Sequence, residues 1–164
     1  MRKITLTHEI ACDETTFWKV FFDREYNYAL YPGVLGFVEF ELQEQTPTSW
    51  RLKGTPKPAV PAVLAKAIGD RFGYVETGTF DPDRRVWSFT MKFNSLSEKL
   101  HEDGTVRVEA VGERRVKRIV DVTIAAKVFG VGGLLESTTE KETRAGWDKS
   151  GAFMDRWVKE HAPG

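Results

Sequence analysis

The chain has one cysteine, Cys12, and only three histidines among its 164 residues. A single cysteine cannot form an internal disulfide, and it excludes a cysteine-rich zinc site. Because disulfide frameworks belong to oxidising compartments, we expect a protein of the reducing cytoplasm. His8, His101 and His161 are too scattered for metal-ligand spacing, and neither HExxH nor GxSxG occurs. We therefore expect no metal site and no serine-hydrolase chemistry.

An excess of charge of either sign is also missing, since 24 basic residues balance 24 acidic residues and the pI is near 6.8. A neutral chain has no overall attraction for nucleic acid, so we expect no nucleic-acid partner. No apolar run approaches the roughly 18 residues of a membrane span or forms the core of a signal peptide. These absences predict a soluble, cytoplasmic protein.

The chain does have the apolar content of an ordinary globular protein, with 41% hydrophobic residues and no repeat or low-complexity tract. A chain of this length can bury roughly 70% of its unfolded surface. We expect a single domain over residues 1–164, with a core large enough to contain a cavity.

The N-terminal segment predicts one strand followed by two short helices. Residues 3–10 alternate between apolar and polar side chains, which is typical of a half-buried strand. Asp13 is placed to cap a short helix that ends near Phe22. A second short helix is predicted from Arg24 to Leu30, ahead of a proline and a glycine.

Alternation with a period of two dominates the middle of the chain and predicts a meander of antiparallel strands. The predicted strands cover residues 37–43, 49–53, 72–80, 85–93, 105–111 and 115–128. Asp103-Gly104 is the strongest hairpin signal in the chain, so we place a turn there. The segment from Pro58 to Ile68 breaks the pattern, and its apolar residues at helical spacing predict a short helix that is either a movable lid or a cap on the core.

A long C-terminal helix is predicted over residues 131–160, which contain no proline and carry one continuous stripe at helical spacing. The stripe consists of Leu135, Thr139, Glu142, Gly146, Ser150, Phe153 and Trp157. Its large apolar residues are at the two ends, and its middle is small or polar. A cavity between helix and sheet is one explanation of this pattern. Close approach of the helix to bulky sheet residues such as Trp87 and Phe89 is the other.

Consecutive strands, with helices gathered near the two ends of the chain, indicate an α+β protein. A curved antiparallel sheet with the long helix across its concave face is the simplest packing. Glycines at 130, 132 and 133 precede that helix as in a dinucleotide-binding loop, but Leu135 replaces the third glycine and no strand follows. We therefore expect a sharp turn at these glycines and no cofactor.

Few ionisable side chains form a pattern that indicates a function. Arg114, Arg115, Lys117 and Arg118 form the one compact basic run, which ordinarily keeps sheet edges from pairing between molecules. Transient contact with anionic lipid headgroups, or with an acidic ligand, is the alternative.

His8 lies on the apolar side of the first predicted strand, where a hydrogen-bonded core histidine is more common than a ligand or acid–base group. Both interpretations stay open. Glu136 and Glu142 lie near the entrance of the long helix and on its stripe, and their default interpretation is solvated charge. Cys12 has no basic neighbour in the sequence to activate it, so we do not expect a nucleophile.

The element order and the last fifty residues resemble the START-like superfamily of helix-grip proteins, also called SRPBCC. It includes lipid-transfer START domains, the birch pollen allergens (Bet v 1-like) and polyketide cyclases. The most specific part is the passage from Val122 to Glu136, in which a long strand runs through glycines into a helix. It looks like bacterial members of a domain-of-unknown-function family.

The resemblance implies a curved, seven-stranded antiparallel sheet wrapped on the C-terminal helix, with two short helices after the first strand. It also implies an apolar cavity for a lipid, sterol or polyketide-like molecule. It supplies no catalytic residue, because the superfamily has no universal catalytic motif. Position on the predicted elements gives these candidate cavity residues: His8, Phe40, Trp87, Phe89, Val122, Ile124, Leu135, Thr139, Glu142, Gly146, Ser150 and Phe153.

The leading hypothesis is a noncatalytic binding protein or carrier for a hydrophobic small molecule. Apolar walls would supply affinity, while His8, Glu142 and Ser150 would orient the ligand. One alternative is a cyclase- or dehydratase-like enzyme in which His8 or Glu142 acts as acid or base. The other is a protein-interaction module without a small ligand.

Overall fold

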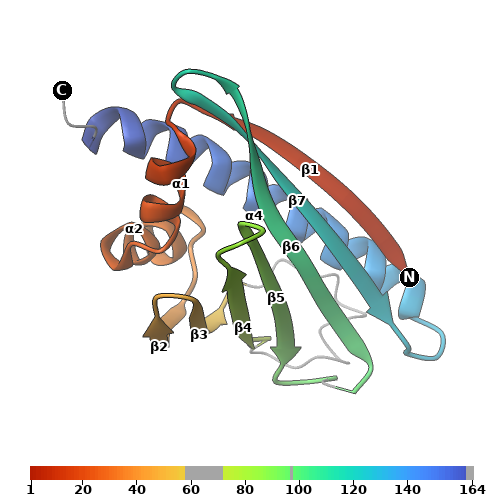
Figure 1. Cartoon of the computed structure of the whole chain (residues 1–164). Coiled ribbons are helices and arrows are strands. Elements are labelled where there is room, and N and C mark those ends of the chain that lie inside the picture. The colour runs from red at the N-terminus through yellow and green to blue at the C-terminus, as the bar shows by residue number, and fades with distance from the viewer. Residues whose placement is uncertain (58–71, 97, 162–164) are drawn as a thin grey trace.

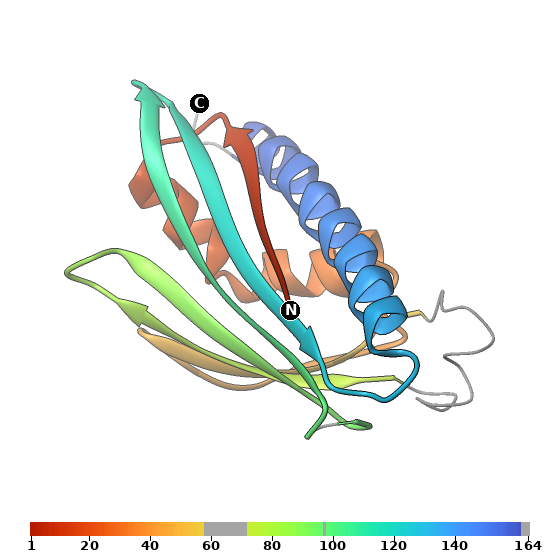
Figure 2. The same ribbon diagram turned by 90° about the vertical axis from the view of Figure 1, so that its right-hand side faces the viewer.

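A curved antiparallel sheet of seven strands and one long C-terminal helix make up most of the molecule (Figure 1, Figure 2). The computed structural model describes residues 1–57, 72–96 and 98–161. The strand order is β1-β7-β6-β5-β4-β3-β2, so the first strand pairs with the last and the others pair with their neighbours in the chain. The predicted α+β helix-grip fold is confirmed.

The strands form where apolar and polar side chains alternate, which gives the sheet one face towards the helix and one towards solvent. Their bounds are β1 (Arg2–Ile10), β2 (Glu39–Thr46), β3 (Ser49–Thr55), β4 (Tyr74–Asp81), β5 (Val86–Phe93), β6 (Leu100–Gly112) and β7 (Arg115–Ala126). The largest difference from the sequence prediction is in β6, which begins five residues earlier than expected.

The hairpin predicted at Asp103-Gly104 is wrong, because both residues lie inside β6 and pair with β5 and β7. A Cβ atom at position 104 would collide with the backbone oxygen of Asp121 and would lie 2.8 Å from the ring of Phe89. The glycine therefore makes room for an aromatic ring that lies across the strand. It does not form a turn.

The two short helices after β1 begin at capping residues that the sequence supplies. Asp13 accepts a hydrogen bond from the backbone of Thr16 at 2.8 Å, and Asp23 accepts one from Tyr26 at 2.9 Å. The helical elements are α1 (Glu14–Phe21), α2 (Arg24–Ala29), the π-helical turn η1 (Leu30–Val34) and α4 (Gly132–His161). The short helix or lid predicted between Pro58 and Ile68 lies outside the described residues.

The long helix α4 packs chiefly on β1 and β7, and in Figure 2 it runs beside β1 along the sheet. Rings of Phe21, Trp50 and Trp87 pack together where α1 meets the sheet, with centroids 4.7–5.7 Å apart. Because α4 lies over one side of the concave face, the strands from β3 to β5 have room beneath the helix.

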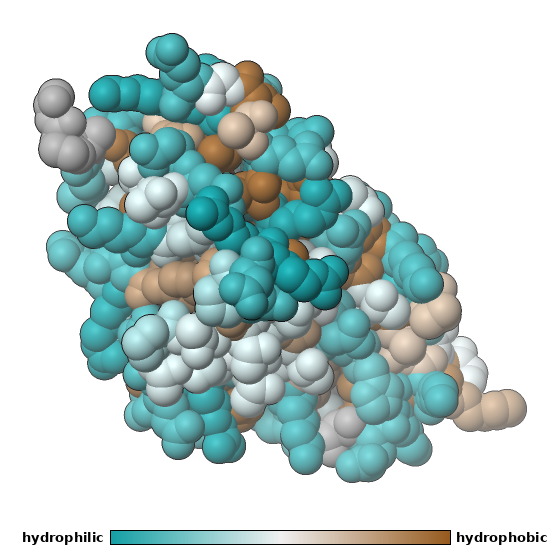
Figure 3. Space-filling view, in the orientation of Figure 1, coloured by the Kyte–Doolittle hydropathy of each residue, from teal (hydrophilic) through white to brown (hydrophobic). Residues whose placement is uncertain are grey.

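The outer surface is mainly hydrophilic in the view of Figure 3. Among the described residues, the exposed large apolar side chains are Met1, Val38, Val111, Phe129 and Leu134. Exposed apolar residues scattered in this way are normal for a globular protein. Most of the large apolar side chains are therefore directed inward, to the core and to the space beneath α4.

We predict that Gly104→Ala lowers the free energy of unfolding by about 1–3 kcal/mol, because the added methyl group meets a backbone oxygen that cannot move aside. Urea unfolding followed by circular dichroism measures the change. Gly146→Ala is the control, since nothing lies within 4 Å of a Cβ at that position in α4. It should raise stability by about 0.4–1 kcal/mol. Wild-type stability in Gly104→Ala would contradict the close packing described above.

Candidate ligand-binding site

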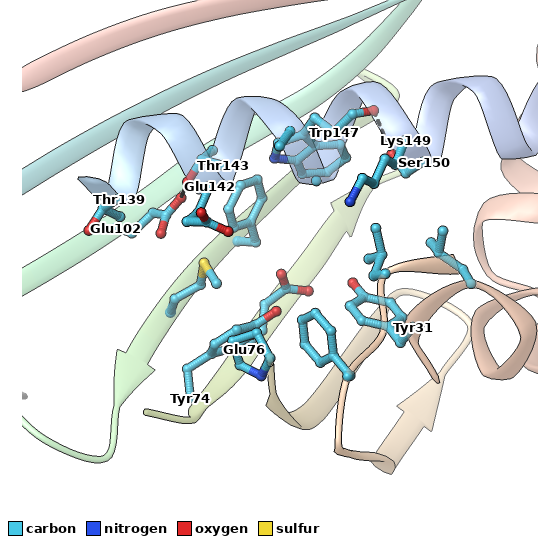
Figure 4. A pocket seen from close by; sticks show the side chains of 18 of the residues that line it. Tyr31, Tyr74, Glu76, Glu102, Thr139, Glu142, Thr143, Trp147, Lys149 and Ser150 are labelled. Atoms are coloured by element: carbon cyan, nitrogen blue, oxygen red, sulfur yellow. Dashed lines mark hydrogen bonds between the residues drawn. The ribbon is translucent and has the colours of Figure 1, made fainter. Parts of the chain in front are cut away.

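A cavity of about 250 Å³ lies between α4 and the concave face of the sheet (Figure 4). Much of its wall is aromatic and includes Tyr31, Phe37, Trp50, Tyr74, Phe89 and Trp147. An apolar cavity on the order of 150 Å³ can bind benzene. The space beneath α4 therefore suits a molecule of about two fused rings.

Small residues on both walls keep this space open. Nothing lies within 4 Å of a Cβ built on Gly146, in the middle of the helical stripe. On the sheet, a Cβ at Gly78 would collide with the indole of Trp87, so the indole lies down against β4. Of the two explanations offered for the small stripe, these contacts favour a cavity over close packing.

The structure brings seven of the candidate cavity residues to the cavity wall. They are Trp87, Phe89, Leu135, Thr139, Glu142, Gly146 and Ser150. Glu142 and Lys149 line the cavity while their side chains are exposed, so the cavity opens to solvent beside α4. Figure 4 shows both side chains projecting from the helix towards the cavity.

The other five candidates are not among the described residues that line the cavity. Val122 and Ile124 are buried in β7, on the part of the sheet that α4 covers. Phe40 stacks on Tyr31, with centroids 4.4 Å apart, and Phe153 stacks on Tyr26 at 5.5 Å. Phe40 and Phe153 thus lie behind tyrosines that do line the cavity.

His8, the fifth of these residues, lies where β1 meets α4. Its Nε2 is 2.8 Å from Oδ1 of Asp148, and its Nδ1 is 3.0 Å from Nη2 of Arg118. Because an arginine only donates, Nδ1 accepts and Nε2 carries the proton that is donated to Asp148. Burial and the charge of Arg118 lower the pKa of His8 below its usual 6.5. The ring is therefore a neutral link between sheet and helix.

Two buried glutamates face the cavity, and the sequence analysis missed both. Glu76 of β4 and Glu102 of β6 are 6% and 4% exposed. Both pair with Met91 of β5, so they belong to one row across the sheet. The alternation of side chains along each strand could have revealed them. It puts Glu76 on the same side as Tyr74, and Glu102 on the same side as Leu100.

Burial raises the pKa of each of these carboxyl groups to about 7. Hydrogen bonds act in the opposite direction. Trp50 donates from Nε1 to Glu76 at 2.9 Å, and Thr143 donates from its hydroxyl to Glu102 at 2.7 Å. Near neutral pH, each carboxyl exchanges between a protonated donor and an ionised acceptor. Such groups can orient a polar part of a ligand or transfer a proton.

Arg118 also reaches the cavity, whereas the sequence analysis placed it in a basic run at a sheet edge. Its neighbours Arg114 and Arg115 are exposed, but Arg118 is only 1% exposed and lines the cavity wall. The alternation of β7 explains the difference, since Val116, Arg118 and Val120 share the buried face. Burial lowers the pKa of Arg118 to about 10, so the side chain remains charged at neutral pH.

The described part of the chain offers no cluster of three histidine, cysteine or acidic side chains for a metal ion. Burial raises the pKa of Cys12 to about 11, so its thiol stays protonated at neutral pH. None of the described helices is both long and apolar enough to cross a membrane. The ionisable groups on the cavity wall are therefore the candidates for a chemical role.

We predict that Glu76→Gln removes part of the pH dependence of stability. Between pH 4.5, the usual pKa, and about 7, the folded state keeps a proton on Glu76 that the unfolded state has released. Raising the pH across this window therefore favours unfolding of the wild type, by about 2–3 kcal/mol. As the pH rises through this window, the free energy of unfolding of the wild type should fall by this amount relative to that of Glu76→Gln. Urea unfolding at stepped pH measures the change.

Glu142→Gln is the control, because it removes an exposed carboxyl group from α4. Its stability curve should run parallel to that of the wild type. Identical pH slopes in Glu76→Gln and wild type would show that Glu76 does not titrate as described.

Comparison with known proteins identifies a family and a fold. Residues 5–158 match the family described as a protein of unknown function, DUF2505. No curated protein matches the chain. The matched range covers nearly the whole chain and includes every strand except the first residues of β1.

Three solved structures show the shared fold. The Zhui aromatase/cyclase from Streptomyces sp. R1128 has a TM-score of 0.69 at 16% identity, over 99% of this chain and 98% of its own. Norcoclaurine synthase from Thalictrum flavum has a TM-score of 0.71 at 17% identity, over 98% of this chain and 87% of its own. A START superfamily protein from Mycobacterium smegmatis has a TM-score of 0.63 at 13% identity, over 96% of this chain and 97% of its own.

Identities this low support a common fold and nothing more specific. The resemblance to START-like proteins is confirmed at the level of the fold, and the resemblance to a family of unknown function is confirmed by the family match. The chain belongs to the DUF2505 family, and it has the START-like helix-grip fold.

Proposed function

We propose that the protein binds an apolar small molecule, of about two fused rings, in the cavity between α4 and the sheet. The observation that carries the proposal is the cavity itself, which has about 250 Å³ of space and walls with many aromatic side chains. Burial of apolar surface supplies affinity, at roughly 25 cal/mol per Å². The few polar groups on the wall fix the orientation of the ligand.

The energetics of an unfilled cavity support this proposal. At roughly 24 cal/mol per Å³, a cavity of this volume costs up to about 6 kcal/mol, which is comparable to the whole stability of a small domain. Large apolar side chains on the middle of α4 would remove most of that cost. A ligand that fills the space makes the same van der Waals contacts, so large side chains on α4 are not needed.

The similar structures offer further support. One structure of norcoclaurine synthase is a complex with dopamine and hydroxybenzaldehyde, which are small aromatic molecules. The Zhui protein is an aromatase/cyclase by name. The same fold thus accepts aromatic molecules in other proteins, and the aromatic walls of this cavity suit a ligand of that kind.

Acid–base catalysis is the second candidate function, and Glu76 and Glu102 are the observation that favours it. A general acid or base works best with a pKa near the working pH, and both carboxyls have a pKa of about 7 inside the cavity. They fit this role better than His8, which is bound to Asp148 and Arg118. They also fit it better than Glu142, which is exposed at the mouth of the cavity.

Native mass spectrometry of freshly purified protein, followed by solvent extraction, distinguishes these functions. A recurring small apolar molecule supports binding, whereas a protein that is always empty favours the protein-interaction module. If the extracted molecule is converted by the wild type but only bound by Glu76→Gln, the protein is an enzyme. Equal recovery of the unchanged molecule from both proteins supports a carrier.

We predict that Gly146→Leu weakens binding of the neutral, two-ring fluorescent probe 1-naphthylamine by at least about tenfold. The leucine side chain would enter the open space beside Gly146 and displace the probe. Because it fills a space that already exists, stability should change by less than the 1–3 kcal/mol typical of overpacking. Fluorescence titration and thermal unfolding measure the two effects.

Gly133→Leu is the matched control, since it makes the same change at an exposed glycine of α4 where nothing lies within 4 Å. It should leave probe binding unchanged. Unchanged binding in Gly146→Leu, together with a large loss of stability, would indicate a closed core in place of a binding cavity.

A further inference from the structure

Arg118 uses only part of its hydrogen-bonding capacity. Its Nη2 donates to the backbone oxygen of Trp147 at 2.8 Å and to Nδ1 of His8 at 3.0 Å. Its Nε is buried and has no hydrogen-bond partner among the described residues. A guanidinium group carries five N–H donors and no acceptor, so only an acceptor atom can satisfy this position.

The guanidinium group is held in place by contacts from both layers of the fold. Its Cζ lies 5.0 Å from the centroid of the Trp147 ring, so the helix supplies a cation–π contact as well as a carbonyl oxygen. His8 reaches it from the neighbouring strand, in register with Arg118. The guanidinium group therefore has a fixed place beside the cavity before any ligand binds.

The charge of Arg118 has no direct counter-ion within the described part of the protein. The charge of Asp148 acts on Arg118, but the carboxylate is bound to the far nitrogen of His8. Glu76 and Glu102 are hydrogen-bonded to Trp50 and Thr143, and neither forms an ion pair with Arg118. A buried charge in this state is unfavourable unless it gains a partner.

Packing does not explain an arginine at this position. Apolar residues of similar volume often replace buried charges without loss of stability, and Met would continue the apolar pattern of β7. Lys57 and Lys149 also border the cavity, but their side chains are exposed and screened by solvent. Among these cations, Arg118 is the one placed to recognise a buried anion.

We infer that the cavity binds an apolar acid, whose carboxylate pairs with the guanidinium group of Arg118 while its rings lie against the aromatic wall. This inference rests on the proposed function, because it requires the cavity to bind a small molecule. Arginine is well suited to a carboxylate, since the bond is charge-assisted and the guanidinium remains ionised at every working pH.

Two probes of nearly equal shape test the inference by isothermal titration calorimetry. They are 2-naphthoate, which carries the carboxylate, and 2-methylnaphthalene, which does not. The wild type should bind 2-naphthoate more tightly. Arg118→Met should weaken 2-naphthoate binding by about 10- to 100-fold, the range expected for one hydrogen bond to a charged group, and change 2-methylnaphthalene binding by less than about threefold.

Arg114→Met is the matched control, because it makes the same change at an exposed arginine that is not among the described residues lining the cavity. It should change the affinity for either probe by less than about threefold. Equal losses for both probes in Arg118→Met would show that Arg118 only supports the structure, and an unchanged affinity for 2-naphthoate would show that it does not contact the acid. Either result overturns the inference.

Measurements on the wild type separate this inference from the proposed function. If 2-methylnaphthalene binds as well as 2-naphthoate, the cavity binds apolar molecules and only the inference fails. If neither probe binds, both fail. Should Arg118→Met not fold, the Nε–Hε resonance of Arg118 in ¹⁵N-labelled wild type decides the matter. It should shift on addition of 2-naphthoate and stay in place with 2-methylnaphthalene, and no shift with 2-naphthoate would overturn the inference.

Discussion

The close contact between α4 and the β1–β7 edge of the sheet at Gly151 determines much of the remaining structure. A Cβ at this position would lie 2.9 Å from the ring of His8 and 3.1 Å from Nη2 of Arg118. Only glycine allows the helix to come this close, and the approach brings the carbonyl oxygen of Trp147 within hydrogen-bonding distance of Arg118. One point of contact thus positions the helix and fixes the buried guanidinium.

The same contact explains where the cavity lies. A straight helix that touches one side of a curved sheet must stand away from the other side, and here that space lies over β3, β4 and β5. Side chains on these strands could have filled it. Glycines in β4 and β6 instead let Trp87 and Phe89 lie down against the sheet, and the middle of α4 carries Gly146 in place of a large residue. The cavity is therefore built by both layers.

Periodicity along the chain predicted the faces of the strands and the stripe of α4, and with them the fold. It could not show which strands the helix covers, so Val122 and Ile124 were assigned to the cavity although they lie beneath α4. Charge was the second source of error. Glu76 and Glu102 were not considered as cavity residues, and Arg118 was assigned to a basic run at a sheet edge, although each shares a strand face with apolar neighbours. Gly104 was assigned to a turn because Asp-Gly is a strong hairpin signal. The Cβ collision that requires a glycine there depends on a neighbouring strand, which the local sequence does not show.

The buried ionisable groups of the cavity differ in how they respond to pH. Arg118 keeps its charge throughout the neutral range, whereas Glu76 and Glu102 gain a negative charge as the pH rises through about 7. Below that pH, the guanidinium is the one charged member of the three, and the cavity is electrostatically suited to an anion. Above it, the two carboxylates add negative charge to the same enclosed space, where solvent screens it weakly. Because burial brings the pKa of both glutamates to about 7, the preference of the cavity for an anion depends on pH.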